Sequence, residues 1–393
     1  MKRIIIFCIS IIYTITSLQA QYKNDNILYK TVYPQELCTL LQNTVGYLLL
    51  DVRSNPEFED TLSSSQNYNL GHLKNAKNIN VRELGTRLSE IEDYKNKPVF
   101  VYCSHSQRSR RASKILADSG FTNIININSG LTGIYQLSAD NCIHNSISTK
   151  LNYNIISAAA LCQEISIKAD NLYILDVRND SAWRNITTDA KLNAYGHFKN
   201  CAHIALADLP LSFAKIPQNK KIVIVDMFGD EASQAAEILS KNNYKNISVL
   251  LEGIDRFFAT DSKQLNCVVG SFISPVKFKI LSTPDFKRFA ETTYGYLTLD
   301  LRSAEEFGGK HKDSWRNIGH LVNALNIPAN TLVNKIESIE KYKSKPVILY
   351  AFSSSTDVYE AANLLVNKGF TNVIVLNGGL FNIRWTAANV QGN

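Results

Sequence analysis

The chain has few cysteines, and their spacing excludes the common metal sites. Seven of the 393 residues are cysteine, and no two of them form a C-x-x-C pair. No other cluster with metal-ligand spacing accompanies them, so we expect no metal site. Cys8 lies in the N-terminal apolar run, which leaves six cysteines in the rest of the chain.

These six cysteines are expected to be mainly free thiols. Cys38 and Cys162 occupy matching places on two predicted helices, which favours buried thiols over disulfides. Cys142 and Cys267 each close a repeat and could pair only if the two ends of a domain meet. If Cys103 stays free, at least one of the other five is also unpaired.

Long apolar runs are absent after the first twenty residues. Lys2 and Arg3 precede an apolar stretch over residues 4–15, and residues 17–20 offer a cleavage site. We therefore expect residues 1–20 to be a signal peptide and the mature protein to be exported, periplasmic or secreted. An uncleaved inner-membrane anchor is the alternative, although the run is short for a membrane span. No stable membrane insertion is expected after cleavage.

Strong net charge is also absent. The formal charge of +7 falls to +5 without Lys2 and Arg3, because 7 − 2 = 5. Spread over the chain, this charge does not predict nucleic acid as a partner. The local exception is a group of three arginines, Arg108, Arg110 and Arg111.

One pattern occurs three times along the chain. The tripeptides that mark it are Asp51-Val52-Arg53, Asp176-Val177-Arg178 and Asp300-Leu301-Arg302. Their spacings are 176 − 51 = 125 and 300 − 176 = 124 residues, and each is followed by a Gly-His pair at 71–72, 196–197 or 319–320. A period this long is a whole domain. We therefore predict three domains, at residues 21–150, 151–275 and 276–393.

Each repeat predicts alternating helices and apolar strands. A helix comes first, at 34–42, 158–167 or 283–292, and then a strand that ends in the tripeptide. A central apolar strand follows, at 98–102, 222–225 or 346–350, and then a second helix at 111–119, 232–242 or 358–368. Strands that are apolar on both faces indicate α/β domains, each a parallel sheet flanked by helices.

The loop after the central strand is the candidate site, because ligands of parallel sheets bind beyond the carboxyl ends of the strands. In the first repeat it contains Cys103, Ser104, His105, Ser106, Gln107, Arg108 and Ser109. We predict Cys103 as the nucleophile and residues 104–109 as the substrate-binding loop. Loop N–H groups and a helix that starts beyond Ser109 would favour a thiolate and a bound anion. Arg108 would hold that anion through two nitrogens, and His105 would be a proton donor or a solvated residue.

Other polar residues of the first repeat receive mainly structural interpretations. Asp51, Arg53 and Glu57 are expected to form an ion pair beneath the loop. Arg110 and Arg111 are expected on a solvated helix face that steers anions. The Gly-His pairs are expected to cap a turn, because all three repeats have them.

The repeat resembles a rhodanese domain, a sulfurtransferase fold. Four segments carry this resemblance: Asp51-Val52-Arg53 with Glu57-Phe58, Gly71-His72 with Ala76, Tyr102-Cys103 through Arg108-Ser109, and Phe121 with Gly130-Leu131. The resemblance implies that Cys103 takes a sulfane sulfur from an anionic donor such as thiosulfate. The resulting persulfide passes its sulfur to a thiol or cyanide, without a metal or organic cofactor. Ser104 departs from the family, whose active members often have arginine there.

The other two loops lack the cysteine. Asp226 and Glu231 replace Cys103 and Arg108 in the second repeat, which would repel an anionic donor. The third repeat has Ala351, and its loop is one residue longer. Both domains are therefore expected to be inactive, with Asp226, Asp230 and Glu231 in a solvated acidic turn.

Two alternatives to the sulfurtransferase remain. The family fold also occurs in cell-cycle phosphatases, so Cys103 could serve a phosphatase or a redox enzyme. The six residues from Cys103 to Arg108 are one fewer than such phosphatases have, which favours the sulfur site. Alternatively, the chain is a non-catalytic binding scaffold of the cell envelope.

Overall fold

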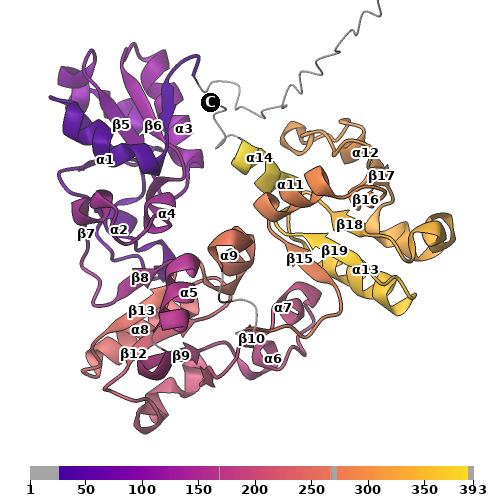
Figure 1. Cartoon of the computed structure of the whole chain (residues 1–393). Helices are drawn as coiled ribbons and strands as arrows, with labels where there is room; N and C mark the ends of the chain where they lie inside the picture. Colours follow the sequence, from indigo (N-terminus) through magenta and orange to yellow (C-terminus); the bar gives the residue numbers. More distant parts are fainter. Residues whose placement is uncertain (1–25, 168, 266, 268–271, 388–393) are drawn as a thin grey trace, which may run out of the picture.

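The computed structural model describes residues 26–167, 169–265, 267 and 272–387. Three five-stranded parallel sheets, each flanked by helices, confirm the predicted α/β fold class (Figure 1). The predicted signal peptide, residues 1–20, lies outside the described residues. Within the described ranges, no helix combines the length and the apolar character that a membrane span requires.

The first domain has the strand order β1-β6-β5-β2-β4. Its elements are β1 (Lys30–Val32), α1 (Pro34–Asn43), β2 (Leu48–Asp51), α2 (Asn55–Phe58), the 3₁₀ turn η1 (Gln66–Tyr68), β3 (His72–Leu73), β4 (Lys77–Asn78), β5 (Val99–Tyr102), α3 (Gln107–Asp118), β6 (Ile124–Ile127), α4 (Gly130–Tyr135) and β7 (Ile147–Ser148).

The second domain repeats this order as β11-β9-β12-β13-β8, read from the opposite edge. Its elements are β8 (Asn154–Ile156), α5 (Ala158–Ile167), β9 (Leu172–Asp176), α6 (Asp180–Trp183), α7 (Ala190–Ala194), β10 (His197–Phe198), β11 (Ala202–His203), β12 (Lys221–Val225), α8 (Asp230–Lys241), β13 (Ile247–Leu250), α9 (Gly253–Ala259) and β14 (Phe272–Ile273).

The third domain has the order β15-β19-β18-β16-β17. Its elements are β15 (Lys279–Leu281), α11 (Thr283–Thr292), β16 (Leu297–Asp300), α12 (Ala304–Phe307), β17 (Leu325–Asn326), β18 (Val347–Tyr350), α13 (Thr356–Asn367), β19 (Val373–Leu376) and α14 (Gly379–Ala387).

Two features of these elements correct the sequence prediction. Each domain begins with a short edge strand (β1, β8 or β15) before its first helix, and three-residue strands are too short to show a clear pattern. The helix after the candidate loop, α3, begins at Gln107 and not beyond Ser109. Gln107, Arg108 and Ser109 therefore form its first turn.

A buried ion pair ties the first strand of each domain to its Gly-His turn. In the first domain, the Arg53 Nη2 atom donates to Asp51 Oδ2 at 2.8 Å and to the Gly71 carbonyl at 2.6 Å. Both side chains are fully buried. Arg178 and Arg302 make the same two contacts in the other domains. This confirms the Asp51–Arg53 part of the predicted ion pair.

The Gly-His pair has the structural role that we expected. His72 stacks on Phe58, and its Nδ1 atom lies 2.9 Å from the Phe58 carbonyl oxygen. Gly71 has a φ of +65°, and a Cβ atom there would lie 2.4 Å from the Ser148 carbonyl oxygen. Glycine is needed because the segment that leaves the domain, β7, pairs with β3 at this turn.

Two disulfides overturn the prediction of free thiols. Cys38 pairs with Cys142, and Cys162 pairs with Cys267, so the two ends of each of these domains do meet. Each bond joins the first helix of a domain to the segment that follows its last helix. Cys103 and Cys201 are the free cysteines of the described residues. The sequence showed the matching cysteines but not that the chain returns to the first helix.

The second domain contacts both the first and the third (Figure 1). At the first junction, the backbone N–H of Gln66 donates to Asp230 Oδ1 at 2.5 Å, and Asn67 Nδ2 donates to the Phe228 carbonyl at 3.2 Å. At the second junction, Thr356 Oγ1 donates to Asp189 Oδ1 at 2.7 Å. In both cases, the segment between the tripeptide and the Gly-His turn of one domain contacts the degenerate loop or its helix in the next.

The disulfides give a direct prediction. Alkylation of the unfolded, unreduced protein should modify Cys103 and Cys201 but none of the four bridged cysteines. Reduction should destabilise the first two domains by about 2–4 kcal/mol each, because each bond closes a loop of over 100 residues. Denaturation with and without reductant measures this, and the third domain serves as the internal control. Labelling of the four cysteines before reduction would contradict the pairing.

Candidate active site

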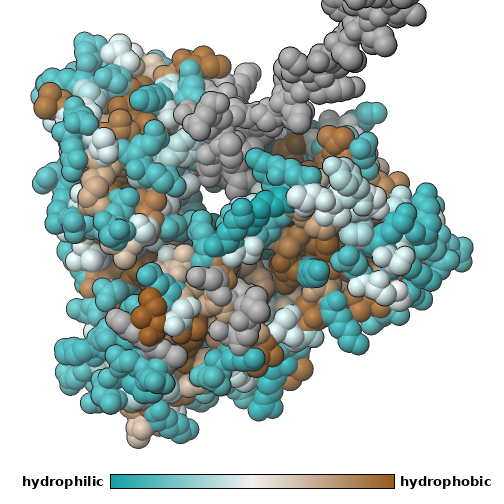
Figure 2. All heavy atoms as spheres, viewed as in Figure 1, coloured by the Kyte–Doolittle hydropathy of each residue, from teal (hydrophilic) through white to brown (hydrophobic). Residues whose placement is uncertain are grey.

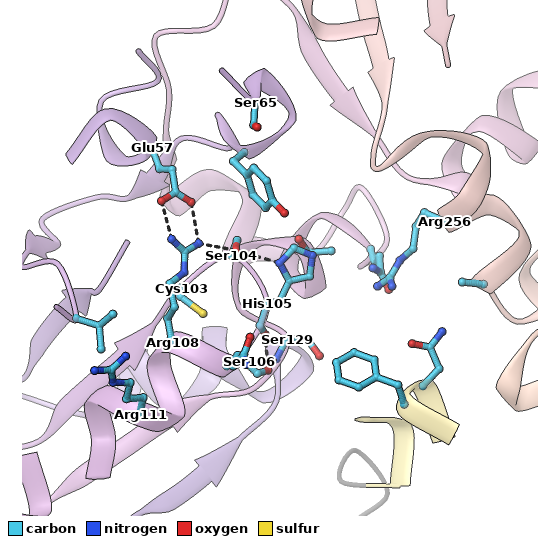
Figure 3. A pocket seen from close by; sticks show the side chains of 18 of the residues that line it. Glu57, Ser65, Cys103, Ser104, His105, Ser106, Arg108, Arg111, Ser129 and Arg256 are labelled. Atoms are coloured by element: carbon cyan, nitrogen blue, oxygen red, sulfur yellow. Dashed lines mark hydrogen bonds and ion pairs between the residues drawn. The ribbon is translucent and has the colours of Figure 1, made fainter. Parts of the chain in front are cut away.

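Cys103 lies where the sequence predicted, directly after the central strand β5. Its exposed fraction is only 1%, yet it lines a cavity of about 1390 Å³ together with the rest of its loop. Figure 3 shows its side chain beside that of Arg108, among residues that line this cavity. The thiol is therefore covered by the loop but borders the cavity and not the hydrophobic interior alone.

The start of α4 holds the Cys103 loop from behind. The backbone N–H groups of Leu131 and Thr132 donate to the carbonyl oxygens of Cys103 and Ser104, at 3.0 and 2.9 Å. A Cβ atom on Gly130 would lie 2.1 Å from the Cys103 carbonyl oxygen. This close approach needs glycine and fixes the backbone on both sides of the thiol.

Arg108 binds Glu57 through both terminal nitrogens, at 2.6 and 2.7 Å, and donates to Ser104 Oγ at 2.9 Å (Figure 3). Burial acts to raise the pKa of Glu57, but the Arg108 hydrogen bonds and charge outweigh it and lower the pKa. Two expectations are thereby corrected. Glu57 pairs with Arg108 and not with Arg53. The two terminal nitrogens of Arg108, which were expected to hold the donor, bind the Glu57 carboxylate instead.

The other predicted loop residues divide into two groups. Ser104, His105, Ser106 and Gln107 line the cavity, and Ser109 does not. Ser109 is buried, and its hydroxyl donates to the Ser106 carbonyl at 3.0 Å. Ser106 donates to Asn128 Oδ1 at 2.7 Å and accepts from the Ser129 N–H at 2.6 Å, which joins the loop to the turn before α4.

The two arginines of the predicted solvated face differ. Arg111 is exposed and lines the cavity, as a steering role requires. Arg110 is 6% exposed, and its Nη2 atom donates to Asn128 Oδ1 at 2.8 Å, so its solvated placement was wrong. The earlier helix start explains this difference, because it turns Arg110 toward β6.

All three domains line the cavity. The second contributes Arg256 and residues 259–261, and the third contributes Thr283, Pro284, Phe381 and Asn382. Figure 2 shows the hollow between the first domain and the other two. The sequence did not predict which residues of the second and third domains reach the cavity, because contacts between domains leave no local pattern. Two degenerate domains therefore form walls of a cavity whose only cysteine is Cys103 among the described residues.

The cavity is lined by more positive than negative side chains. Its arginines are Arg82, Arg108, Arg111 and Arg256, and its carboxylates are Glu57 and Asp261. Both carboxylates are paired, Glu57 with Arg108 and Asp261 with Arg288. Arg82 and Arg111 are exposed and form no ion pair within the described residues. The cavity therefore favours an anion.

The second domain places its own carboxyl group in the equivalent loop. Asp226 follows β12 as Cys103 follows β5, and its carboxylate accepts from the N–H groups of Gly229 and Glu231, at 2.5 and 2.8 Å. Burial raises the Asp226 pKa to about 7 against these hydrogen bonds. The prediction of a solvated acidic turn was therefore wrong for Asp226, which is buried. Asp230 and Glu231 are half-buried, and Asp230 joins the turn to the first domain.

The third loop has lost the nucleophile but kept the carboxylate that corresponds to Glu57. Ala351 follows β18, and α13 begins five residues later, at Thr356, so the extra residue lies in the loop. Glu306 corresponds to Glu57, and Arg316 binds it at 2.6 Å in place of a loop arginine. In the second domain both partners are replaced, by Ala182 and Glu231. The Glu57–Arg108 pair, with a loop arginine, therefore occurs only beside Cys103 in the described chain.

Several site residues were missed by the sequence interpretation. Glu252 of the second domain binds His105 Nε2, and Arg256, Arg82 and Phe381 line the cavity. The one available signal was Glu252 itself, a glutamate directly before the Gly253 turn. No group of three or more His, Cys, Asp or Glu side chains in the described ranges could hold a metal ion.

The buried Asp226 gives a testable pH dependence. Its folded pKa lies above the unfolded value of 3.8, so the folded state retains a proton and this group's stability contribution falls as the pH rises from about 4 to 7. Asp226→Asn removes the titration. We compare the free energy of unfolding of Asp226→Asn with that of wild type. This difference should favour the variant by about 2 kcal/mol more at pH 8 than at pH 5.

Urea denaturation of both proteins at the two pH values measures this difference. The exposed Asp208→Asn is the matched control and should show no such change. If the free energy of unfolding of Asp226→Asn differs from that of wild type by the same amount at both pH values, Asp226 is not protonated in the folded state at pH 5.

Comparison with known proteins agrees with the repeat structure. The Rhodanese-like domain family matches three times, over residues 34–137, 158–260 and 286–385. Uncharacterized protein YqhL of Bacillus subtilis is 35% identical over 130 residues, which are 32% of this chain and 86% of that protein. Uncharacterized protein YibN of Escherichia coli K12 is 33% identical over 95 residues, 24% of this chain and 58% of that protein.

Two solved structures are also similar to this chain in sequence. A rhodanese with anions from Escherichia coli is 28% identical and covers 23% of this chain and 92% of its own, with a TM-score of 0.19. A thiosulfate sulfurtransferase from Pseudomonas aeruginosa is 16% identical and covers 92% and 66%, with a TM-score of 0.23. The three family matches together span most of the chain, and the protein belongs to the Rhodanese-like domain family.

Proposed function

We propose that this protein is a sulfurtransferase with one competent site, at Cys103. The Cys103 thiolate attacks the outer sulfur of an anionic donor such as thiosulfate. A bond forms between the two sulfurs, the S–S bond of the donor breaks, and sulfite leaves with its electron pair. A thiol or cyanide then takes the outer sulfur and restores the thiolate. The electrons balance without an outside oxidant.

The observation that carries this proposal is the carboxyl group that backbone N–H groups hold in the equivalent loop of the second domain. The Asp226 carboxylate accepts hydrogen bonds from Gly229 and Glu231, which correspond in sequence to Ser106 and Arg108. The loop of Cys103 likewise lies between the carboxyl end of the central strand and the start of a helix, which supports stabilisation of a thiolate, a persulfide anion and the departing sulfite. The N-terminus of helix α3 at Gln107 adds a partial positive charge that also favours these anions.

The cavity supports an anionic donor and a larger second substrate. Arg82 and Arg111 lie on the first domain's side, where they can attract a dianion before it reaches Cys103. A cavity of about 1390 Å³ exceeds the needs of thiosulfate. A thiol acceptor with a sizeable non-reacting part would fill more of it. The partners proposed are therefore small molecules and not nucleic acid.

We further propose that the protein is exported to the periplasm or secreted. The N-terminal segment, residues 1–20, supports this through its basic start and apolar run. The two disulfides also support it, because such bonds persist mainly in oxidising compartments.

Replacement of Cys103 tests the proposal most simply. Wild type should convert thiosulfate and cyanide to sulfite and thiocyanate, and Cys103→Ala should lose at least about a thousandfold in turnover, because the covalent route is gone. Cys201→Ala is the matched control and should keep full turnover. Burial raises the pKa of Cys201 to about 12, so that thiol is not ionised at neutral pH. Equal turnover in wild type and Cys103→Ala would refute the proposal.

The two unpaired arginines give a second prediction. Arg111→Ala and Arg82→Ala should each raise the KM for thiosulfate about threefold and leave kcat nearly unchanged, since each removes an exposed attractive charge worth up to about 1 kcal/mol. The effect should shrink at high salt, because ions screen exposed charges. The control is Arg87→Ala, an exposed arginine paired with Glu83 and Glu90 outside this cavity. Unchanged KM values at low salt in both cavity variants would contradict the steering role.

A further inference from the structure

Glu252 has a backbone conformation that glutamate rarely adopts. It stands between β13 and α9 with a φ of +54°, in the left-handed region. The corresponding residues are Ser129 in the first domain and Gly378 in the third, each directly before the glycine that starts the last helix. A long side chain is strained there, and such strain is common at functional sites. The strain alone identifies no role, so the contacts of the side chain decide.

The Glu252 carboxylate reaches out of its own domain. One oxygen binds His105 Nε2 in the Cys103 loop, and the other lies 3.4 Å from Arg256 Nε. Burial acts to raise the Glu252 pKa, but the charges of Arg256 and His105 outweigh it and lower the pKa to about 2. Glu252 is therefore ionised at any pH at which the protein would work, and it bridges two domains beside the cavity.

His105 is held at both ring nitrogens. Its Nδ1 atom lies 2.9 Å from Ser104 Oγ, and its Nε2 atom faces Glu252. Ser104 Oγ in turn accepts from Arg108, which binds Glu57. Figure 3 shows the part of this series from Glu57 through Arg108 and Ser104 to His105, beside Cys103. Because Glu252 is the only member from the second domain, it links that domain to the shape of the catalytic loop.

We propose that Glu252 is a positioning residue for the Cys103 site, supplied by the domain that lacks a cysteine. It fixes the His105 ring, and through Ser104 and Arg108 it fixes the loop that must match the developing charge on the departing group. The catalytic site of the first domain is thus incomplete without the second. This inference rests on the proposed sulfurtransferase function and concerns which domain completes the site.

A positioning role predicts a distinct kinetic pattern in the full chain. Glu252→Ala should lower kcat for thiosulfate about tenfold and change the KM less than twofold, because the loop geometry matters most in the transition state. Glu252→Gln retains an oxygen that accepts from His105 and should recover kcat to within about threefold of wild type. Glu237→Ala is the control, since Glu237 pairs with Lys241 on α8 and does not line the cavity.

Two further variants separate positioning from a general loss of structure. Glu252→Gly removes the backbone strain, so it should unfold at the wild-type temperature or above, yet lose kcat as Glu252→Ala does. In a His105→Ala background, Glu252→Ala should cause no further loss, because the residue acts through His105.

The outcomes are distinguishable from failure of the proposed function. If wild type transfers no sulfur, that function fails before Glu252 is tested. If wild type is active and Glu252→Ala keeps kcat within twofold, the positioning role is wrong. A tenfold loss that persists in the His105→Ala background would also overturn it, since the effect would then not pass through His105.

Discussion

The buried pair between the strand-end aspartate and the arginine two residues later holds each domain together. Arg53, Arg178 and Arg302 each bind their aspartate and the carbonyl of a Gly-His turn, with almost no exposure to solvent. Loss of one partner would leave an unpaired buried charge, at a cost of about 3–5 kcal/mol. This requirement fixes the sheet edge and the turn in all three copies, so the loop after the central strand can change without loss of the fold.

The three loops have diverged into different physical roles. The first keeps a thiol beside a cavity, and the second fills the corresponding place with its own Asp226 carboxylate. The third has Ala351 and turns its helix α13 toward the second domain. In the first two domains, the segment before the Gly-His turn contacts the degenerate loop of the next domain or the helix after it, which forms two junctions. These junctions place three domains around one cavity.

The sequence predicted the features that depend on local residue patterns. It missed the contacts between residues that lie far apart along the chain. The three domains, the helix α5 and the place of Cys103 follow from periodicity and strand patterns. The disulfides do not, because Cys38 and Cys142 approach only after the whole domain folds. The burial of Arg110 and the Arg108–Glu57 pair depend on the exact start of α3. Glu252 could not be assigned, because its partner lies in another domain.

The proposed function requires that the transferred sulfur is held on the Cys103 sulfur atom. Intact-mass spectrometry of the full protein after treatment with thiosulfate, followed by peptide mapping, tests this most directly. The account predicts one added sulfur atom, located at Cys103 and removed by cyanide. No added sulfur, or sulfur located at Cys201 instead, would contradict it.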